Sequence, residues 1–263
     1  MIFMKKSSFV IHLIYLIMVS LLTSSCEESN KPLVIGHRGA KGHVAENTLP
    51  SISKALEMGV DGVEIDVFLC RSGELVVFHD KTLEKLSDGE GFIEDLTLDS
   101  IRKISVLGGY KIPTLNEVLD LIQGSVFLNI ELKGSGTAKP TEKLIKEYLK
   151  TGKWNAQQFI ISSFNWEELE IFYQLNQNIP IAILTGADPL DAIPIAKGLN
   201  AQAINPNFRA LTQKNVEKMQ KEGFKVFPYT INEPDHIEKM LAFKVDGIIT
   251  DYPERVTEAL SED

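Results

Sequence analysis

The chain has 263 residues, of which 44% are hydrophobic and 24% are charged, as in ordinary globular proteins. Its formal charge is −9; residues 1–25 hold two lysines and no acidic residue, so the rest of the chain carries −11. This acidity argues against a nucleic-acid-binding protein, and the roughly 238 residues after residue 25 are enough for one large α/β domain.

The first 25 residues have the features of a signal peptide. Two lysines precede an apolar run from Phe9 to Leu22, which is short for a membrane span, and small residues then lead to Cys26. The pattern resembles a bacterial lipoprotein signal, which implies acylation of Cys26, a polar tether over 26–32 and a membrane anchor outside the cytoplasm. Plain secretion and an uncleaved anchor are the alternatives. With Cys26 acylated, Cys70 has no disulfide partner.

The folded part, 33–263, opens with a short apolar strand from Leu33 that ends at His37. A helix is expected from 50 to 58, because Asn47 and Thr48 can cap it, Pro50 fits its first turn, and Gly59 ends it.

The stretch 62–80 is the most informative part of the chain. Glu64 and Asp66 are two residues apart in an apolar strand, so their side chains lie on one face. Two buried carboxylates repel each other unless a cation compensates them, and oxygen ligands suit Mg²⁺ or Ca²⁺. The chain then turns near Gly73 and returns to His79 and Asp80 without any helical pattern, which predicts a hairpin-like excursion.

After a polar insert at 81–111 and a capped helix over 113–122, strands and helices alternate regularly. Strands are predicted over 126–133, 159–164, 181–185, 201–205, 225–232 and 247–251, with helices over 140–149, 166–175, 189–197, 212–222, 234–243 and 253–260. About eight β/α units of this length predict a closed (β/α)₈ TIM barrel; a doubly wound open sheet is the alternative.

In such barrels the active site lies at the carboxyl ends of the strands. The polar residues at the predicted strand ends, or in the loops that follow them, form a larger set: His37, Arg38, Glu64, Asp66, His79, Glu131, Lys133, Asn205, Asn232 and Asp251. Glu131 and Lys133 again share one face of a strand. The sequence therefore predicts that these charged groups meet at one mouth.

The chain resembles the glycerophosphodiester phosphodiesterase family from about Leu33 to Glu258. The motifs that carry the resemblance are His37-Arg38-Gly39, Glu46-Asn47-Thr48, Glu64-Ile-Asp66, His79-Asp80, Ile112-Pro-Thr-Leu115, Glu131-Leu-Lys133 and Thr250-Asp251-Tyr-Pro253. The resemblance implies a barrel of the phosphatidylinositol phospholipase C type. It also implies metal-dependent hydrolysis of a glycerophosphodiester to glycerol 3-phosphate and an alcohol.

The resemblance also implies residue roles. It makes Glu64, Asp66 and Glu131 ligands of one Mg²⁺ or Ca²⁺ ion and makes His37 and His79 the acid–base pair. Arg38 and Lys133 would hold phosphate oxygens. Asn232 is placed to contact substrate, and Glu46 to support the site from behind. Which histidine is the acid, and whether water or a substrate hydroxyl attacks, stays open.

Three functional hypotheses follow. The first is a membrane-anchored glycerophosphodiester phosphodiesterase. The second is a phosphodiesterase that acts on lysophospholipids, and the third is a barrel that binds phosphodiesters without turnover. The headgroup and the oligomeric state are not deducible from the sequence.

Overall fold

In the part of the chain that the structure describes, eight parallel strands form a barrel-like sheet, and a ninth strand pairs antiparallel with one of them. The computed structural model describes residues 31–262, so the predicted signal segment and Cys26 lie outside the described residues. The parallel strands are β1 (Leu33–His37), β2 (Gly62–Leu69), β4 (Phe127–Leu132), β5 (Phe159–Ser163), β6 (Ile181–Thr185), β7 (Ala203–Pro206), β8 (Lys225–Val226) and β9 (Gly247–Thr250). They pair in the order β8-β7-β6-β5-β4-β2-β1-β9.

Backbone hydrogen bonds also join the two ends of this order. The amide of Asp246 donates to Val226 O (3.1 Å) and that of Ile249 to Pro228 O (3.0 Å). The sheet is thus a nearly closed barrel, which confirms the predicted (β/α)₈ fold.

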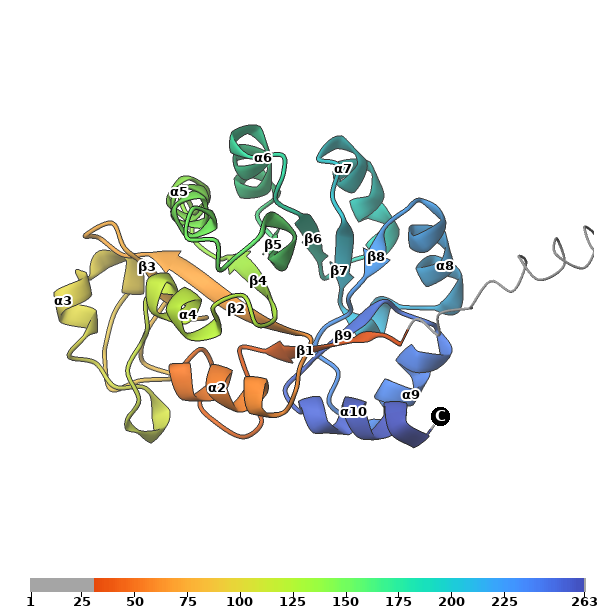
Figure 1. Ribbon diagram of the computed structural model, residues 1–263, viewed down its shortest axis with the longest axis horizontal. Helices are drawn as coiled ribbons and strands as arrows, with labels where there is room; N and C mark the ends of the chain where they lie inside the picture. The colour runs from red at the N-terminus through yellow and green to blue at the C-terminus, as the bar shows by residue number, and fades with distance from the viewer. Residues whose placement is uncertain (1–30, 263) are drawn as a thin grey trace, which may run out of the picture. The chain divides into compact units, whose positions relative to one another are not determined.

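Helices surround the barrel (Figure 1). They are α2 (Leu49–Glu57), α4 (Leu115–Ile122), α5 (Ala138–Leu149), α6 (Trp166–Leu175), α7 (Ile193–Gly198), α8 (Gln213–Lys221), α9 (Pro234–Ala242) and α10 (Pro253–Glu262). Local sequence starts several of them: the Thr48 hydroxyl accepts from Ser51 N at the start of α2 (3.2 Å), and Thr114 and Glu117 form a capping box on α4. Among the described residues, no helix has the length and apolar character needed to cross a bilayer.

The strand predicted over 225–232 is much shorter, since β8 covers only Lys225–Val226. Pro228 has no N–H to give to a ladder. The chain nevertheless stays beside β7, because Phe227 N donates to Ile204 O (3.1 Å) and Tyr229 N to Pro206 O (3.1 Å).

Two apolar layers hold the barrel. The larger packs the outer faces of the strands against the helices. The smaller fills the barrel interior with Ile35, Ile160, Ala182, Ala203, Phe227 and Ile249. Glycines make room for the rings inside: a Cβ at Gly62 would lie 2.2 Å from the Phe127 ring, and one at Gly247 would lie 2.8 Å from the Phe227 ring.

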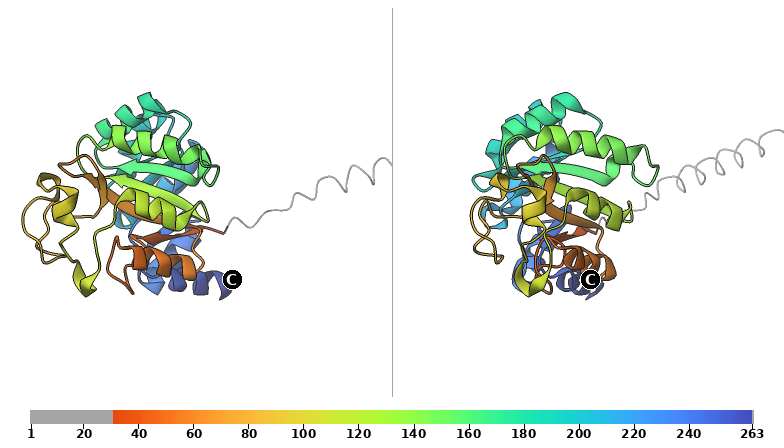
Figure 2. Two further views of the ribbon diagram at one scale, coloured as in Figure 1. Left: turned by 60° about the vertical axis from the view of Figure 1, so that its left-hand side comes forward. Right: turned by 90° about the vertical axis from the view of Figure 1, so that its left-hand side faces the viewer.

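The predicted hairpin is present, because β3 (Leu75–Val77) pairs antiparallel with β2. The segment after it, 81–111, forms a small lobe with α3 (Leu98–Ile101), η1 (Ile93–Asp95) and η2 (Leu107–Gly109). Its core includes Ile93 and Ile101, and it packs on Phe68, Val76 and Phe78 of the hairpin. Figure 2 (left) shows this lobe in yellow, at the opposite end of the barrel from the end of α10.

Candidate active site

Strand register brings the predicted site residues together. His37 on β1 is level with Glu64 on β2, and Asp66 is level with Glu131 on β4. The hairpin returns His79 to the same place, since Phe78 N donates to Asp66 O (3.0 Å). A cavity of about 190 Å³ opens here. It is lined by His37, Arg38, Glu64, His79, Asn129, Glu131, Lys133, Ser162, Phe164, Leu184, Tyr229, Thr230 and Ile249.

Three buried carboxylates form the centre of the site. One oxygen from each of Glu64, Asp66 and Glu131 lies within 4.8 Å of the other two. Burial, followed by the charges of Asp66 and Glu131, holds the pKa of Glu64 well above its usual value. Burial and Asp66 likewise raise the pKa of Glu131 to about 7. Burial also acts to raise the pKa of Asp66, but Arg38, His79 and Lys133 outweigh it, so that pKa is lowered.

The same trio fits a hard divalent cation. All of the offered atoms are carboxylate oxygens, which Mg²⁺ and Ca²⁺ prefer. Asp66 Oδ1 is buried and accepts no hydrogen bond from any described residue. Such an atom is costly in a folded protein unless something else binds it.

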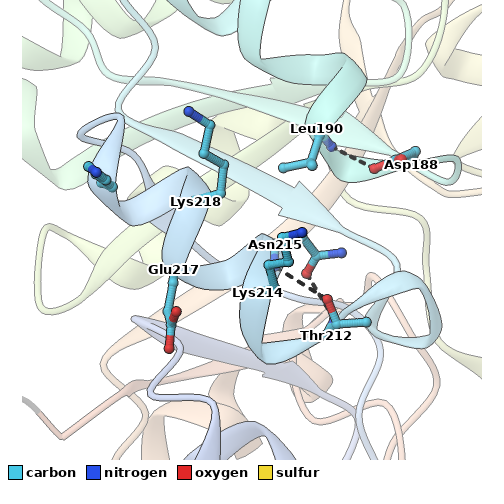
Figure 3. Close-up of a pocket in the computed structure, with 8 residues that line it drawn as sticks. Asp188, Leu190, Thr212, Lys214, Asn215, Glu217 and Lys218 are labelled. Atoms are coloured by element: carbon cyan, nitrogen blue, oxygen red, sulfur yellow. Dashed lines mark hydrogen bonds between the residues drawn. The ribbon is translucent and has the colours of Figure 1, made fainter.

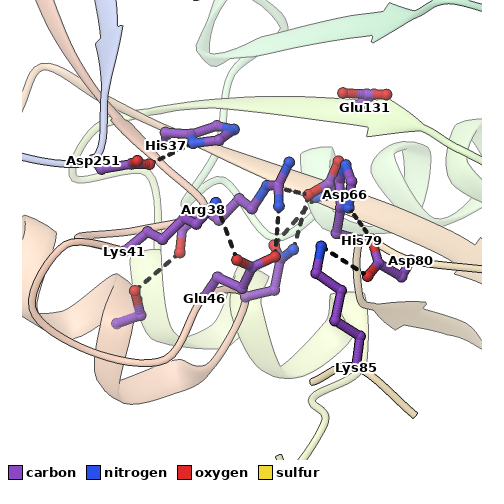
Figure 4. Close-up of polar contacts among 12 residues, drawn as sticks. His37, Arg38, Lys41, Glu46, Asp66, His79, Asp80, Lys85, Glu131 and Asp251 are labelled. Carbon is purple, nitrogen blue, oxygen red and sulfur yellow. Dashed lines mark hydrogen bonds and ion pairs between the residues drawn. The ribbon is translucent and has the colours of Figure 1, made fainter. Parts of the chain in front are cut away.

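Each histidine is held by a carboxylate through the same ring nitrogen (Figure 4). His37 Nδ1 lies 2.6 Å from Asp251 Oδ1, and His79 Nδ1 lies 2.5 Å from Asp80 Oδ1. With Nδ1 donating to the carboxylate, Nε2 is the nitrogen of each ring that faces the site. His37 Nε2 lies 3.9 Å from Glu64, and His79 Nε2 accepts from Lys133 Nζ (3.2 Å). Burial is the largest reason why the pKa of both histidines is lowered.

Arg38 has a strained backbone that the site holds in place. Its φ is 54°, in the left-handed region that is costly for a residue with a side chain. Its amide donates to Glu64 Oε2 (3.1 Å), and its guanidinium binds Glu46 (2.5 Å) and Asp66 (3.1 Å). Glu46 also pairs with Lys41 (3.2 Å). Glu46 therefore lies behind Arg38 and outside the lining of the cavity, and its predicted supporting role stays a prediction.

Lys133 closes the opposite side of the acid cluster. Its Nζ lies 2.9 Å from Glu131 and 3.8 Å from Asp66. Burial acts to lower the pKa of Lys133, but Glu131 and Asp66 outweigh it and raise the pKa, so the ammonium stays charged. This same-face ion pair lies on the cavity wall rather than on a solvated surface.

Asn232 is turned toward Asp251 and does not line the cavity. Its amide donates to Asp251 Oδ2 (2.8 Å), and its Oδ1 accepts from Asp251 N (3.0 Å). It thus steadies the carboxylate that holds His37, and its predicted contact with substrate stays a prediction. Asn205 is fully buried and is also absent from the cavity wall.

Sequence reasoning missed several neighbours of the site. Asn47 donates to Asp66 Oδ2 (2.8 Å), and Asn129, Ser162 and Tyr229 line the cavity. The signal for Asn129 was available, because it lies two residues before Glu131 and therefore on the same face of one strand. Tyr229 lies beyond the end of β8, so the alternation of side chains along a strand does not predict which way its side chain points.

A second hollow, of about 530 Å³, lies between η4 (Pro189–Ala192) and α8 (Figure 3). Its lining includes Asp188, Thr212, Lys214 and Lys218. Much of this polar lining is engaged in helix capping: Thr212 caps α8, and Asp188 caps η4. Of these two cavities, the smaller one therefore has the acid, base and charged groups that an active site needs.

Comparison with known proteins agrees with this site. Residues 37–255 match the model of the glycerophosphoryl diester phosphodiesterase family. A glycerophosphodiester phosphodiesterase of Caldanaerobacter subterraneus subsp. tengcongensis is 38% identical over 234 residues, which cover 85% of this chain and 96% of the relative.

Solved structures are similar over nearly the same range. An Oleispira antarctica phosphodiesterase, in complex with the product sn-glycerol-3-phosphate, has a TM-score of 0.81 and 30% identity; the match covers 89% of this chain and 98% of that one. A glycerophosphodiester phosphodiesterase from Thermotoga maritima has a TM-score of 0.72 and 26% identity, with 86% and 98% covered.

Proposed function

The chain belongs to the glycerophosphoryl diester phosphodiesterase family, and from this premise we propose that it hydrolyses glycerophosphodiesters to glycerol 3-phosphate and an alcohol, with one divalent cation and with His37 and His79 as acid and base. The observation that carries the proposal is the arrangement of one cavity. Two imidazoles, each fixed by a carboxylate through Nδ1, share it with a buried trio of acids.

Glu64, Asp66 and Glu131 would hold the cation. Bound there, Mg²⁺ or Ca²⁺ would place positive charge beside the phosphate oxygens, where negative charge grows in the transition state. Arg38 and Lys133 add two fixed positive charges at the rim of the same trio. Each of these groups would stabilise the transition state more than the singly charged diester.

The histidines would move the protons. With Nδ1 donating to a carboxylate, each ring presents Nε2, which accepts a proton when neutral and gives one when charged. One ring would take the proton of the attacking oxygen, and the other would protonate the departing alcohol. Asp251 and Asp80 would stabilise whichever ring carries the charge.

The test is a release assay on deacylated glycerophosphodiesters and on lysophospholipids, with Mg²⁺, with Ca²⁺ and with excess chelator. We expect glycerol 3-phosphate release that depends on the cation. Glu64→Ala and His79→Ala should each lower kcat by roughly 10²–10⁴-fold, while circular dichroism stays unchanged. His43→Ala is the matched control, because His43 pairs with Glu254 outside the cavity.

Each outcome bears on a different part of the proposal. Full activity in excess chelator would refute the cation, and an active His79→Ala enzyme would refute the acid–base pair. Turnover of lysophospholipids alone would favour the larger substrate. Binding without product, with either cation present, would favour a barrel that does not catalyse.

The proposal includes a location. The sequence of residues 1–25 supports a lipoprotein signal, acylation of Cys26 and a membrane tether outside the cytoplasm. Mass spectrometry of the purified chain should then find a diacylglyceryl group on Cys26, and Cys26→Ser should move the protein to the soluble fraction. A chain that keeps residues 1–25 would contradict this.

A further inference from the structure

The cavity has two chemically different walls. Its formal charges come from β1, β2, β4 and the loop after β3. The other wall, from β5 and β6 around to β9, is uncharged: Ser162, Phe164, Leu184, Tyr229, Thr230 and Ile249. The charged wall suits the phosphate. The uncharged wall therefore faces a part of the substrate that carries no charge.

Asn129 lies where the two walls meet. It is level with Glu64 of β2 and two residues before Glu131 on β4, so its side chain points to the barrel interior. It is only 3% exposed, yet its buried Oδ1 has no hydrogen-bond partner among the described residues. On the next strand, the buried Ser162 hydroxyl is also without a partner within the described part of the chain.

Unpaired buried amides are rare, because leaving one unpaired destabilises the fold. Most polar groups around the site are paired: Asn47 with Asp66, Asn232 with Asp251 and Tyr229 with Thr185 O. Because Asn129 lines the cavity, its unpaired Oδ1 points to a ligand that donates a hydrogen bond there. A hydroxyl group can donate such a bond.

We propose that Asn129 recognises the glycerol part of the substrate by binding its terminal hydroxyl, the one farthest from phosphorus; this inference rests on the proposed function. Same-face residues of a strand are about 7 Å apart, so Asn129 lies one step deeper than Glu131. That step is about the reach from phosphorus to the far end of glycerol. The 2-hydroxyl stays near the carboxylates and histidines.

The depth of Asn129 also orients the diester. A headgroup such as choline or ethanolamine carries a cation, and the uncharged wall offers it no carboxylate. The departing alcohol then extends past Phe164, which is 48% exposed at the mouth. Glycerol lies deep and the variable alcohol lies outward.

The experiment compares kcat/KM for two diesters of ethanolamine phosphate: one with glycerol, and one with propane-1,2-diol joined through its primary oxygen. The second diester lacks only the terminal hydroxyl, so a role of the 2-hydroxyl in the chemistry is preserved. The wild-type enzyme should prefer the glycerol diester by roughly tenfold or more, the effect of one buried hydrogen bond.

The variant Asn129→Leu keeps the volume and removes the amide. It should lose roughly tenfold on the glycerol diester and little on the propanediol diester, with an unchanged Mg²⁺ concentration for half-maximal activity. Thr141→Val is the control, because the Thr141 hydroxyl on α5 is also buried, has no hydrogen-bond partner among residues 31–262 and lies outside the cavity.

Equal wild-type activity on both diesters would overturn the inference without any variant, and leave the proposed function intact. An equal loss of kcat/KM on both diesters in Asn129→Leu would show that the amide has a structural role. A higher Mg²⁺ concentration for half-maximal activity would show that the amide helps to bind the cation. A wild-type enzyme that cleaves neither diester would instead refute the proposed function itself.

Discussion

At the scale of single residues, the site is built from charges that are each held by a second residue. Asp251 and Asp80 hold the two imidazoles, and Glu46 and Asn47 hold Arg38 and Asp66. A side chain that is fixed before the substrate arrives loses no freedom during the reaction, so its charge acts at full strength in the transition state.

Asp251→Asn tests this at His37. The hydrogen bond and charge of Asp251 raise the pKa of His37 against the larger lowering by burial. Without the carboxylate that pKa should fall further, and the inflection that belongs to His37 in the pH profile of kcat/KM should move to lower pH. We also expect kcat to fall by roughly 10²–10⁴-fold. Glu254→Gln, which alters the exposed partner of His43, should leave the profile in place; an unmoved inflection in Asp251→Asn would refute the role.

Glu131 gives a prediction for stability without a cation. Burial and Asp66 raise its folded-state pKa to about 7 from an ordinary value of 4.5. A raised pKa favours the folded state below the unfolded pKa, and that contribution is lost as pH rises from about 4.5 through 7. The rise in Tm caused by saturating Mg²⁺ or Ca²⁺ should therefore be larger at pH 8 than at pH 5. Glu131→Gln should make the rise in Tm at pH 8 more similar to that at pH 5. A cation-induced rise in Tm that is the same at both pH values would contradict this role of Glu131.

At the scale of elements, a buried carboxylate ties a helix to the loop that follows Lys133. Glu168 on α6 accepts hydrogen bonds from Gly136 N (2.6 Å) and Ala138 N (2.8 Å), at the start of α5. Ala138 is the first residue of α5 and Gly136 lies just before the helix, so neither amide has an acceptor in the first turn, and Glu168 acts as a capping residue would. The loop between β4 and α5 is thereby held next to the site.

Glu168→Ala leaves those amides buried without an acceptor. It should lower the free energy of unfolding by about 1–3 kcal/mol, measured by urea denaturation, and raise KM through a looser Lys133. The control Glu170→Ala removes an exposed carboxylate of the same helix and should change stability by less than ~0.5 kcal/mol. Equal effects of the two substitutions would argue against the tie.

Much of this element plan follows from the sequence. Alternating apolar segments predict eight strands because each strand is buried on both faces, and Thr48 and Thr114 predict helix starts because their hydroxyls cap free amides. The i, i+2 spacing also predicts that Glu64 and Asp66 converge. The hydrogen bond of Asn232 to Asp251 did not follow from the sequence, because Asn232 comes after an extended segment interrupted by Pro228. The direction of a side chain there depends on Asp251, which is distant in sequence.

At the scale of the whole molecule, the lobe at 81–111 packs against the hairpin that carries His79, outside the barrel. Its core packs on Phe68, Val76 and Phe78, which belong to the hairpin that ends at His79. The position of His79 therefore depends on packing on the far side of the hairpin. The sequence showed the insert as a polar segment and gave no sign of this dependence, which arises only from tertiary contacts.

Ile101→Ala in the lobe core should lower stability by about 2–5 kcal/mol, since the residue is fully buried. It should also reduce kcat at a temperature where the protein remains folded, while the Tm rise given by the cation persists. Leu107→Ala is the control, because Leu107 is 59% exposed on the same lobe. Unchanged kcat in folded Ile101→Ala would show that the lobe does not position His79.

The rings packed inside the barrel have a consequence for the order of events in turnover. Phe127 and Phe227, each opposite a glycine, lie one step nearer the strand starts than Asn129 and Tyr229, and their rings pack in the barrel interior beneath the cavity. We therefore expect the substrate to enter, and both products to leave, through the mouth at the carboxyl ends of the strands. If the glycerol part of the diester lies deepest, the alcohol leaves first and glycerol 3-phosphate leaves last. Glycerol 3-phosphate should then be a competitive inhibitor against every diester, whatever its headgroup.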